Sequence, residues 1–232
     1  MNDLDLLRRK LASSCRVLAK EGHADGTAGH VSARIDSETF LMKPSGFGLE
    51  EIGPDDLVIL NLEGQKMEGK RKPHNEIPIH SEIYRVRPDV GCIIHTHPFY
   101  SITFAATGQE LRPISHHASR FWPGVAHYPT GELIVNKEQG EKVAACLGDR
   151  NAVFLRNHGI AVTGASVEDA CLAAVYLEKA CRMQLMLINY SNYYYASDEE
   201  SAEFGKRFSK PSRSLSHWNY YLRKWGEESF EK

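Results

Sequence analysis

The chain has few cysteines and no long apolar run, and both absences narrow its class. Its five cysteines are odd in number and widely spaced, and none forms a C-x-x-C pair, so neither a disulfide framework nor a zinc finger is indicated. Nowhere do about 18 apolar residues follow one another, as a membrane span requires. The opening stretch MNDLDLLRRK places acids among its leucines, unlike a secretory signal segment. We therefore expect a cytoplasmic protein with reduced thiols.

The chain also lacks an excess of either charge. Its 28 lysines and arginines and 30 aspartates and glutamates give a formal net charge of −2, with both signs mixed along the sequence. This distribution offers no basic stripe to a nucleic acid and no polybasic anchor to a membrane surface. The 232 residues, 42% of them hydrophobic, can bury one sizeable core. A small-molecule partner is therefore the default expectation.

Helical and strand signals alternate along the chain. Leucines recur at helical spacing before Gly22, Pro88 ends a second helix expected over 76–86, and further helices are expected from Tyr100 and from Ser166. Strands are expected at 30–35, 39–43, within 56–70 as a pair turning at 63–64, and at 91–95, 125–128 and 152–157. Mixed elements without a repeat period predict a central sheet with helices on both faces.

The composition changes near residue 191. Residues 191–232 are polar and rich in tyrosine, serine and lysine, as in NYSNYYYASDEES. We expect 1–190 to form the main domain and 191–232 to be a tail or lid that packs on the same domain or on a neighbouring subunit.

The stretch GCIIHTHP, residues 91–98, ends an apolar strand with two histidines. Alternate side chains of a strand share a face, so His95 and His97 project together while Thr96 points the other way. Two imidazoles placed in this way can reach one metal ion. An H-x-H pair also occurs on surfaces and in cores, so the pair alone does not choose between a ligand role and a structural one.

His158 and Glu76 shift that balance. His158, in FLRNHGIAV, follows another apolar strand at a glycine turn and should also stand at a strand end. Three neutral imidazoles with an open position form a Lewis-acid zinc site, and an added carboxylate also suits manganese or another divalent ion. Glu76, in HNEIPIH, can supply that carboxylate. The helix dipole alone would also favour an acid at this position.

Several motifs, in their order along the chain, resemble the class II aldolase/adducin family: GTAGHVSAR, KPSG, Glu76 followed by His80, RPDVGCIIHTHP, RNHG and GASVEDA. The resemblance implies that residues 1–190 are a catalytic α/β/α three-layer domain with a central mixed, largely antiparallel sheet. It implies a homotetramer with active sites at subunit interfaces. It also implies one divalent ion per subunit, zinc or manganese, held by His95, His97 and His158 with Glu76.

The resemblance also implies roles in catalysis. In the family, the acid matching Glu76 can leave the metal and act as general base or acid, because its pKa rises in a desolvated pocket. The metal would chelate substrate oxygens, so that carbon-carbon cleavage leaves an enolate. The sugar-phosphate aldolases of the family add a tyrosine from the adjacent subunit. Tyr128, in VAHYPTGEL, is its match as proton donor, and an ordinary strand tyrosine is the alternative.

The phosphate-binding pairs of those aldolases are only partly present. Ser45 and Gly46 match a Ser-Gly pair, whereas a Gly-Asn pair is replaced by Gly29-His30 and a Ser-Ser pair by His74-Asn75. Bulky imidazoles narrow the pocket and suit a flatter, less charged anion such as a carboxylate.

A second cluster could bind a planar carboxylated ring by stacking and ion pairing. The stretch SHHASRFWPG supplies His116, His117, Arg120, Phe121 and Trp122. A loop that packs these aromatic side chains under a neighbouring subunit is an equally good interpretation.

Three functions remain. The Gly-His-Val-Ser motif is similar to that of metal-dependent decarboxylases of hydroxylated aromatic or pyridine carboxylic acids in the family, so decarboxylation of such a non-phosphorylated acid is favoured. Retro-aldol cleavage of a sugar or sugar phosphate is the alternative, and a non-enzymatic association module like adducin is the third. Among the other histidines, we expect His80 to pack behind the site or support it. We expect His23 and His217 to face solvent or subunit contacts.

Overall fold

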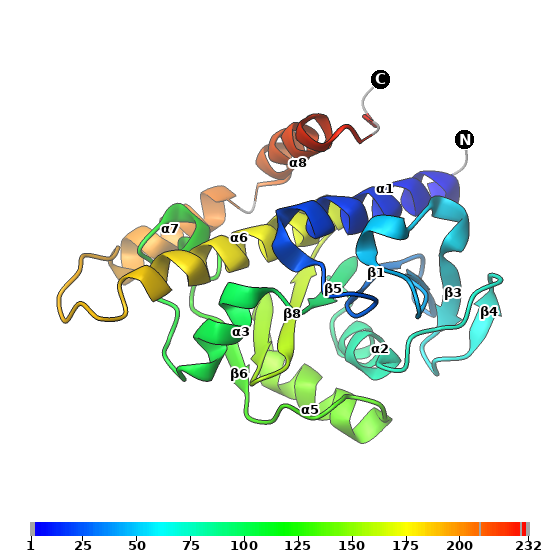
Figure 1. The fold of residues 1–232 in the computed structure, drawn as a ribbon, viewed down its shortest axis with the longest axis horizontal. Helices are drawn as coiled ribbons and strands as arrows, with labels where there is room; N and C mark the ends of the chain where they lie inside the picture. The colour runs from blue at the N-terminus through cyan, green and yellow to red at the C-terminus, as the bar shows by residue number, and fades with distance from the viewer. Residues whose placement is uncertain (1–2, 209, 228, 231–232) are drawn as a thin grey trace.

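A sheet of eight strands lies at the centre of the computed structural model, which describes residues 3–208, 210–227 and 229–230 (Figure 1). Its spatial order is β4-β3-β2-β1-β5-β8-β7-β6, and every neighbouring pair is antiparallel except β6 and β7. The strands are β1 His30–Arg34, β2 Thr39–Met42, β3 Val58–Asn61, β4 Lys66–Glu68, β5 Cys92–Thr96, β6 Ala126–Tyr128, β7 Ala152–Leu155 and β8 Gly159–Gly164. The predicted mixed, largely antiparallel sheet is therefore confirmed.

Helices cover both faces of this sheet (Figure 1). One face carries α1 (Asp3–Leu18), α3 (Phe99–Ala106) and α6 (Val167–Met186), and the other carries α2 (Ile77–Val86) and α5 (Lys137–Leu147). The remaining helices are η1 Ala19–His23, η2 Leu49–Glu51, η3 Pro54–Asp56, α4 His116–Ser119, α7 Asp198–Phe208 and α8 Pro211–Trp225. This is the expected three-layer α/β/α arrangement. Among the described residues, no helix combines the length and apolar character needed to cross a membrane.

Side-chain alternation along β5 divides the interior into two cores. Cys92 and Ile94 pack in the core beneath α1 and α6, whereas Ile93 packs in the core beneath α2 and α5. Because alternate side chains of a strand share a face, His95, two residues after Ile93, also points to the side of α2. The functional residues at the end of β5 are thus continuous with a packed core.

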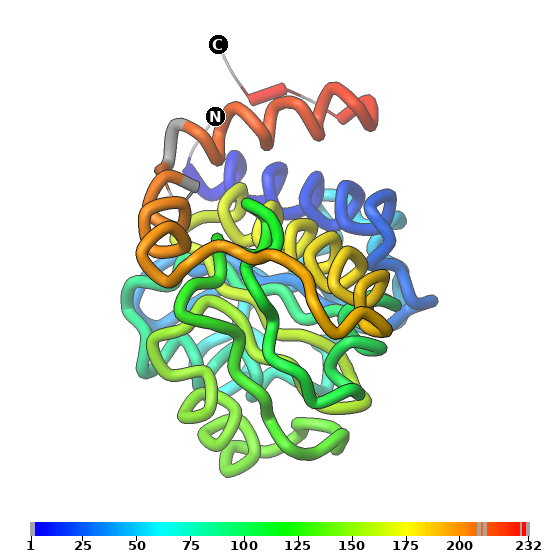
Figure 2. Tube along the Cα trace, turned by 90° about the vertical axis from the view of Figure 1, so that its left-hand side faces the viewer, coloured from blue at the N-terminus to red at the C-terminus, as the bar shows by residue number. Residues whose placement is uncertain are grey.

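Helices α5, α7 and α8 differ from the sequence-based expectation. Helix α5 was not predicted, although its start carries a readable signal: Asn136 and Gln139 form a reciprocal capping box. The polar tail contains α7 and α8, and α8 runs along α1 and α6 on the outside of the molecule (Figure 2). Helix α8 contributes Trp218, Tyr221 and Leu222 to the same hydrophobic cluster as the buried residues of α1 and α6. Its amphipathic spacing was hidden by an overall polar composition. A lid function for 191–232 and the boundary at residue 190 stay predictions.

Truncating Leu222 tests whether α8 is part of the folded core. Leu222 is 0% exposed and Leu215, on the same helix, is 44% exposed. We expect Leu222→Ala to lower the free energy of unfolding by about 2–5 kcal/mol, because it leaves a cavity, and Leu215→Ala to change it by less than about 0.5 kcal/mol. Urea unfolding followed by circular dichroism measures both. Equal effects would contradict docking of α8 on the core.

Candidate functional site

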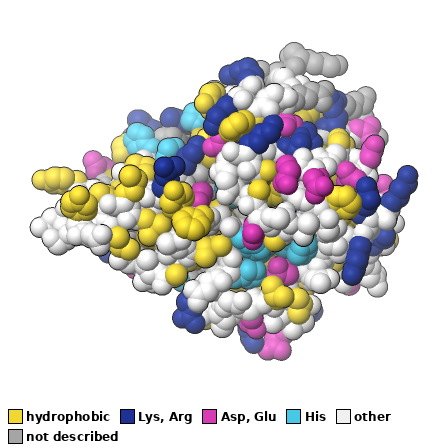
Figure 3. All heavy atoms as spheres, viewed as in Figure 1, with side chains coloured by type: hydrophobic (Ala, Val, Ile, Leu, Met, Phe, Trp, Pro, Cys, Tyr) yellow, Lys and Arg dark blue, Asp and Glu magenta, His cyan; other side chains and the backbone are white. Residues whose placement is uncertain are grey.

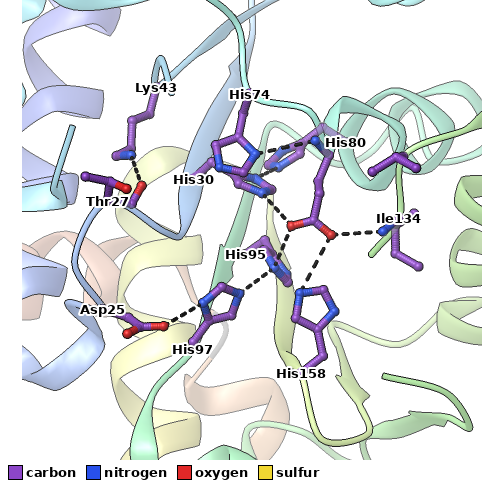
Figure 4. Close-up of polar contacts among 12 residues, drawn as sticks. Asp25, Thr27, His30, Lys43, His74, His80, His95, His97, Ile134 and His158 are labelled. Carbon is purple, nitrogen blue, oxygen red and sulfur yellow. Dashed lines mark hydrogen bonds and ion pairs between the residues drawn. The ribbon is translucent and has the colours of Figure 1, made fainter. Parts of the chain in front are cut away.

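A cluster of histidines lies where β1 begins and β5 ends, next to the β7–β8 turn and the start of α2 (Figure 4). His95 and His97 come from β5 and the residue that follows its end, and their Nε2 atoms are 3.0 Å apart. The His158 ring lies 4.8 Å from the His95 ring and 5.2 Å from the His97 ring, measured between centroids. On the face seen in Figure 3, histidine side chains also gather near the centre. The structure therefore brings the three predicted ligands together.

Close backbone packing makes this convergence possible. In the antiparallel register, His30 pairs with His95, and Ile160 pairs with Thr96. A Cβ atom on Gly159 would lie 2.6 Å from both the His97 ring and the Thr96 carbonyl oxygen, so a side chain there would displace the ring. The turn before Gly159 is held by Asn157, whose φ of 58° is left-handed. Residues 157 and 159 thus position the histidine between them.

Glu76 places its carboxylate against these rings. Its Oε2 lies 3.6 Å from His30 Nε2 and 3.7 Å from His95 Nε2, and its Oε1 lies 3.6 Å from His158 Nε2. Oε1 also accepts a hydrogen bond from the Ile134 amide at 2.9 Å. Burial raises the pKa of Glu76, but the His158 and His95 rings and the Ile134 amide outweigh this effect and lower it to about 2. The carboxylate is therefore ionised at neutral pH.

The donor set fits a divalent cation. Burial lowers the pKa values of His95 and His97, which keeps both imidazoles neutral and their lone pairs free for a ligand. The buried Nε2 atoms of His158 and His30 have no hydrogen-bond partner in the described structure. Two groups of side chains could each hold an ion, because the ligand atoms within each group lie within 4.8 Å of one another. The first group is His95, His97 and His158, and the second is His30, Glu76 and His95.

Two residues between α1 and β1 contact the end of β5: Asp25, which was not singled out from sequence, and His23, the last residue of η1. The Asp25 carboxylate accepts a hydrogen bond from His97 Nδ1 at 3.0 Å, which leaves His97 Nε2 directed at the cluster. On the opposite face, His23 Nδ1 lies 2.9 Å from Thr96 Oγ1. Thr96 points away from the histidines, as predicted. The expectation that His23 faces solvent or a subunit contact is wrong, because this loop passes behind β5 and leaves His23 0% exposed.

A buried cation also acts on His30 and His74 (Figure 4). The His74 ring lies 4.1 Å from the His30 ring between centroids. Lys43, which is fully buried, donates to the carbonyl oxygens of Thr27 and Pro44 at 3.3 Å each. Burial lowers the pKa values of His30 and His74, and the charge of Lys43 lowers them further. Lys43 was not singled out from sequence, although a lysine at the end of the apolar strand TFLMK was a usable signal.

Of the other predicted substrate residues, Gly29 lies at the end of β5, Ser45 and Gly46 lie near the segment that leads to His74, and Asn75 lies elsewhere. Gly29 packs against the end of β5, because a Cβ atom there would lie 3.4 Å from the His95 carbonyl oxygen. The Ser45 amide and hydroxyl both donate to the Lys72 carbonyl, which holds the Ser45-Gly46 turn near the segment leading to His74. Asn75 is exposed and lines a separate cavity with Leu62 and Val135. Asn75 thus lies outside the histidine cluster of its own chain.

Tyr128, His116 and His117 are also placed apart from Glu76 within one chain. The buried Tyr128 donates to Glu132 Oε1 at 3.1 Å, and burial followed by this carboxylate raises its pKa. His116 lies against Phe204 of α7, and His117 lies against Tyr176 of α6, on the other side of the sheet from α2. His80, as expected, supports the site from behind by contacting His30 Nδ1 at 2.6 Å.

Removing the charge of Asp25 tests its contact with His97. We expect Asp25→Asn to weaken zinc binding about 10-fold or more, because a carboxylate orients the ring and raises its basicity better than an amide does. Competition with a chromophoric chelator on the metal-free protein measures the affinity. Asp149→Asn, the same change in an exposed loop, is the control and should bind as wild type does. Identical affinities for all three proteins would contradict the role of Asp25.

Comparison with known proteins places the chain among lyases. It is 33% identical over 193 residues to a 3,4-dihydroxyphthalate decarboxylase of Arthrobacter keyseri, covering 78% of each chain. It is 29% identical over 202 residues to a 5-deoxy-D-ribulose 1-phosphate aldolase of Bacillus thuringiensis, covering 87% of this chain and 94% of the relative. An aldolase II superfamily protein of Pseudomonas syringae superposes with a TM-score of 0.86 at 28% identity, covering 97% and 94% of the two chains.

The family model of the class II aldolase and adducin N-terminal domain matches residues 9–185. This range contains the whole histidine cluster and Glu76, and it confirms the resemblance carried by the motifs. The chain therefore belongs to the class II aldolase and adducin N-terminal domain family.

Proposed function

We propose that the protein is a divalent-metal-dependent decarboxylase of a non-phosphorylated, hydroxylated aromatic or heteroaromatic carboxylic acid. The observation that carries the proposal is the group of side chains next to Glu76, where the tilted rings of His30 and His74 lie 4.1 Å apart between centroids and feel the charge of the buried Lys43. We infer that these side chains line the substrate pocket. The two aromatic rings narrow this pocket and the ammonium gives it one positive charge, a combination that suits a flat monoanionic group.

Class II aldolases use a divalent metal, and the histidine cluster fits one. We assign His95, His97, His158 and Glu76 as ligands of zinc or manganese, since both accept mixed imidazole and carboxylate donors. A bound ion would supply a Lewis acid that polarises the substrate oxygens. Neutral rings and an ionised carboxylate are the protonation states that such binding requires.

Lys43 is the candidate anchor of the substrate carboxylate. Within the described chain its ammonium contacts carbonyl oxygens and no carboxylate. A buried cation without an anionic partner is costly, so an incoming carboxylate would relieve this cost. Ser45 and Gly46 lie close along the chain and could complete this end of the pocket.

Glu76 is assigned the proton transfers. Its carboxylate would accept the proton of a ring hydroxyl as the substrate binds. When the bond between the ring carbon and the carboxyl group breaks, carbon dioxide leaves and the electron pair stays on the ring carbon. That carbon then takes the proton back from Glu76, so protons and charge balance.

Other residues would act across a subunit interface. In a homotetramer with interfacial sites, Tyr128 could serve as a second proton donor, and Asn75, His116 and His117 could face the pocket of a neighbouring subunit. Exposed apolar side chains that gather at one end of the face seen in Figure 3 support such an assembly. Exposed large apolar side chains of the described residues include Phe99, Met186, Ile188 and Tyr190.

Retro-aldol cleavage of a sugar phosphate is the second candidate. The similarity to the Bacillus thuringiensis aldolase and the presence of the Ser45-Gly46 pair favour it. An association module without activity is disfavoured, because such a module needs no carboxylate held among three imidazoles.

Product analysis separates the two enzymatic functions. We expect the zinc- or manganese-loaded protein to release carbon dioxide from hydroxylated aromatic acids, with 3,4-dihydroxyphthalate as the first to try, and no aldehyde from ketose 1-phosphates. Glu76→Gln should lower kcat about 100-fold or more, because it removes the proton carrier. Release of aldehyde without carbon dioxide would establish the aldolase instead. A protein that binds no divalent ion would exclude both.

Replacing Lys43 tests the carboxylate anchor. We expect Lys43→Met to raise KM for the acid about 10-fold or more with little change in kcat, because the apolar stem is kept and one charge-assisted hydrogen bond is lost. Removing a buried charge should not destabilise the fold, which thermal unfolding would check. Lys70→Met, at an exposed position, is the control. An unchanged KM would assign the anchor to other residues.

A further inference from the structure

We propose that a buried hydrogen-bond chain from Tyr84 through Ser32 and His80 fixes His30 as a neutral Nε2–H donor to the substrate carboxylate. In this assignment His30 binds substrate and is not a metal ligand, and the other three are positioning residues. The identity of the accepting group, a carboxylate, rests on the proposed decarboxylase function.

The four side chains are joined by short contacts and are all buried. His30 Nδ1 lies 2.6 Å from His80 Nε2, His80 Nδ1 lies 2.6 Å from Ser32 Oγ, and Ser32 Oγ lies 2.8 Å from the Tyr84 hydroxyl. Periodicity brings them together, because Ser32 is two residues after His30 on β1 and Tyr84 is four residues after His80 on α2.

The phenol of Tyr84 sets the direction of this chain. The contact between Ser32 Oγ and the Tyr84 hydroxyl allows either atom to donate. A buried phenol that does not donate is left with an unsatisfied proton, which is costly, so we take Tyr84 as the donor. The Arg34 guanidinium lies 4.5 Å from the centre of the Tyr84 ring, which makes the phenol a better donor. Tyr84 therefore donates to Ser32. The Ser32 hydroxyl then donates its own proton to its other partner, His80 Nδ1.

The protonation of His80 and His30 follows, because a neutral imidazole carries a proton on only one of its two nitrogens. Ser32 donates to His80 Nδ1, so a neutral His80 carries its proton on Nε2. His80 Nε2–H then donates to His30 Nδ1. A neutral His30 is left with its proton on Nε2.

That proton points into the active site. His30 Nε2 is buried without a hydrogen-bond partner, and Glu76 Oε2 lies 3.6 Å away. A substrate carboxylate that displaces Glu76 would find an N–H donor there, next to the Lys43 charge. A protonated Nε2 has no lone pair for an ion, so the set of His30, Glu76 and His95 is excluded and the set of His95, His97 and His158 remains.

Nitrogen-15 spectra of histidine-labelled protein test the tautomer directly, independently of activity. We expect His30, assigned by its loss in His30→Asn, to show a protonated Nε2 and an unprotonated Nδ1 in the metal-free and zinc-loaded protein. Tyr84→Phe keeps the ring packing and removes the first donor, so it should give a mixture of His30 tautomers. A proton on Nδ1 in the wild type, or no change in Tyr84→Phe, would overturn the proposal.

Ligand binding tests the consequence. His80→Gln retains an amide donor near the position of Nε2, whereas His80→Leu does not. Calorimetric titration with 3,4-dihydroxybenzoate should give a Kd about 10-fold or more weaker in His80→Leu and close to wild type in His80→Gln, with zinc content unchanged in both. Loss of zinc in His80→Leu would overturn the assignment, because the chain would then support the metal.

These outcomes are separable from the proposed function. If no acid releases carbon dioxide but the tautomer is as expected, the decarboxylase function fails and the His30 assignment stands. If carbon dioxide is released and His30 carries its proton on Nδ1, only the present inference fails.

Discussion

Side-chain alternation along β5 is the constraint on which the rest of the structure depends. Ile93 and His95 face α2, whereas Cys92 and Ile94 face α1 and α6. A slip of one residue would exchange both faces, so the register that buries the two cores also places the histidines. His95 is fixed by the sheet itself, whereas His97 directly follows β5 and His158 lies in the turn between β7 and β8, so both depend on the ends of strands that the sheet holds in place.

The two charges of the site differ in how the free protein supports them. Burial raises the pKa of Glu76, but the His158 and His95 rings and the Ile134 amide lower it to about 2, whereas the Lys43 ammonium has carbonyl oxygens as its partners. Among the described residues the Lys43 ammonium has no carboxylate partner, which a sequence selected for stability alone would avoid. A cation near Glu76 and an anion near Lys43 would each relieve one of these charges. A negative group for a cation and a positive group for an anion are what a site for an ion together with an acidic substrate requires.

Local pattern predicted much of this arrangement, and tertiary packing decided the rest. The strand period was enough to place His95 and His97 on one face, and the family motifs supplied the partners. His23 failed as a prediction because its burial depends on where a loop passes behind β5, which no nearby residue reveals. Lys43 was overlooked because lysines are rarely buried. Helix α8 was missed because its apolar side chains, Trp218 among them, form one narrow stripe within a polar segment.

The order of strands has a consequence for how the protein is held together. Strand β5 joins β1 on one side to β8 on the other, and the candidate ligands come from Glu76, the end of β5 and the turn before β8. An unfolded chain keeps only the adjacent pair of histidines, so an ion bound by the complete set is linked to the native state. Such an ion would act as a late cross-link between the two halves of the sheet. Its dissociation and the opening of the sheet around β5 would then be coupled events.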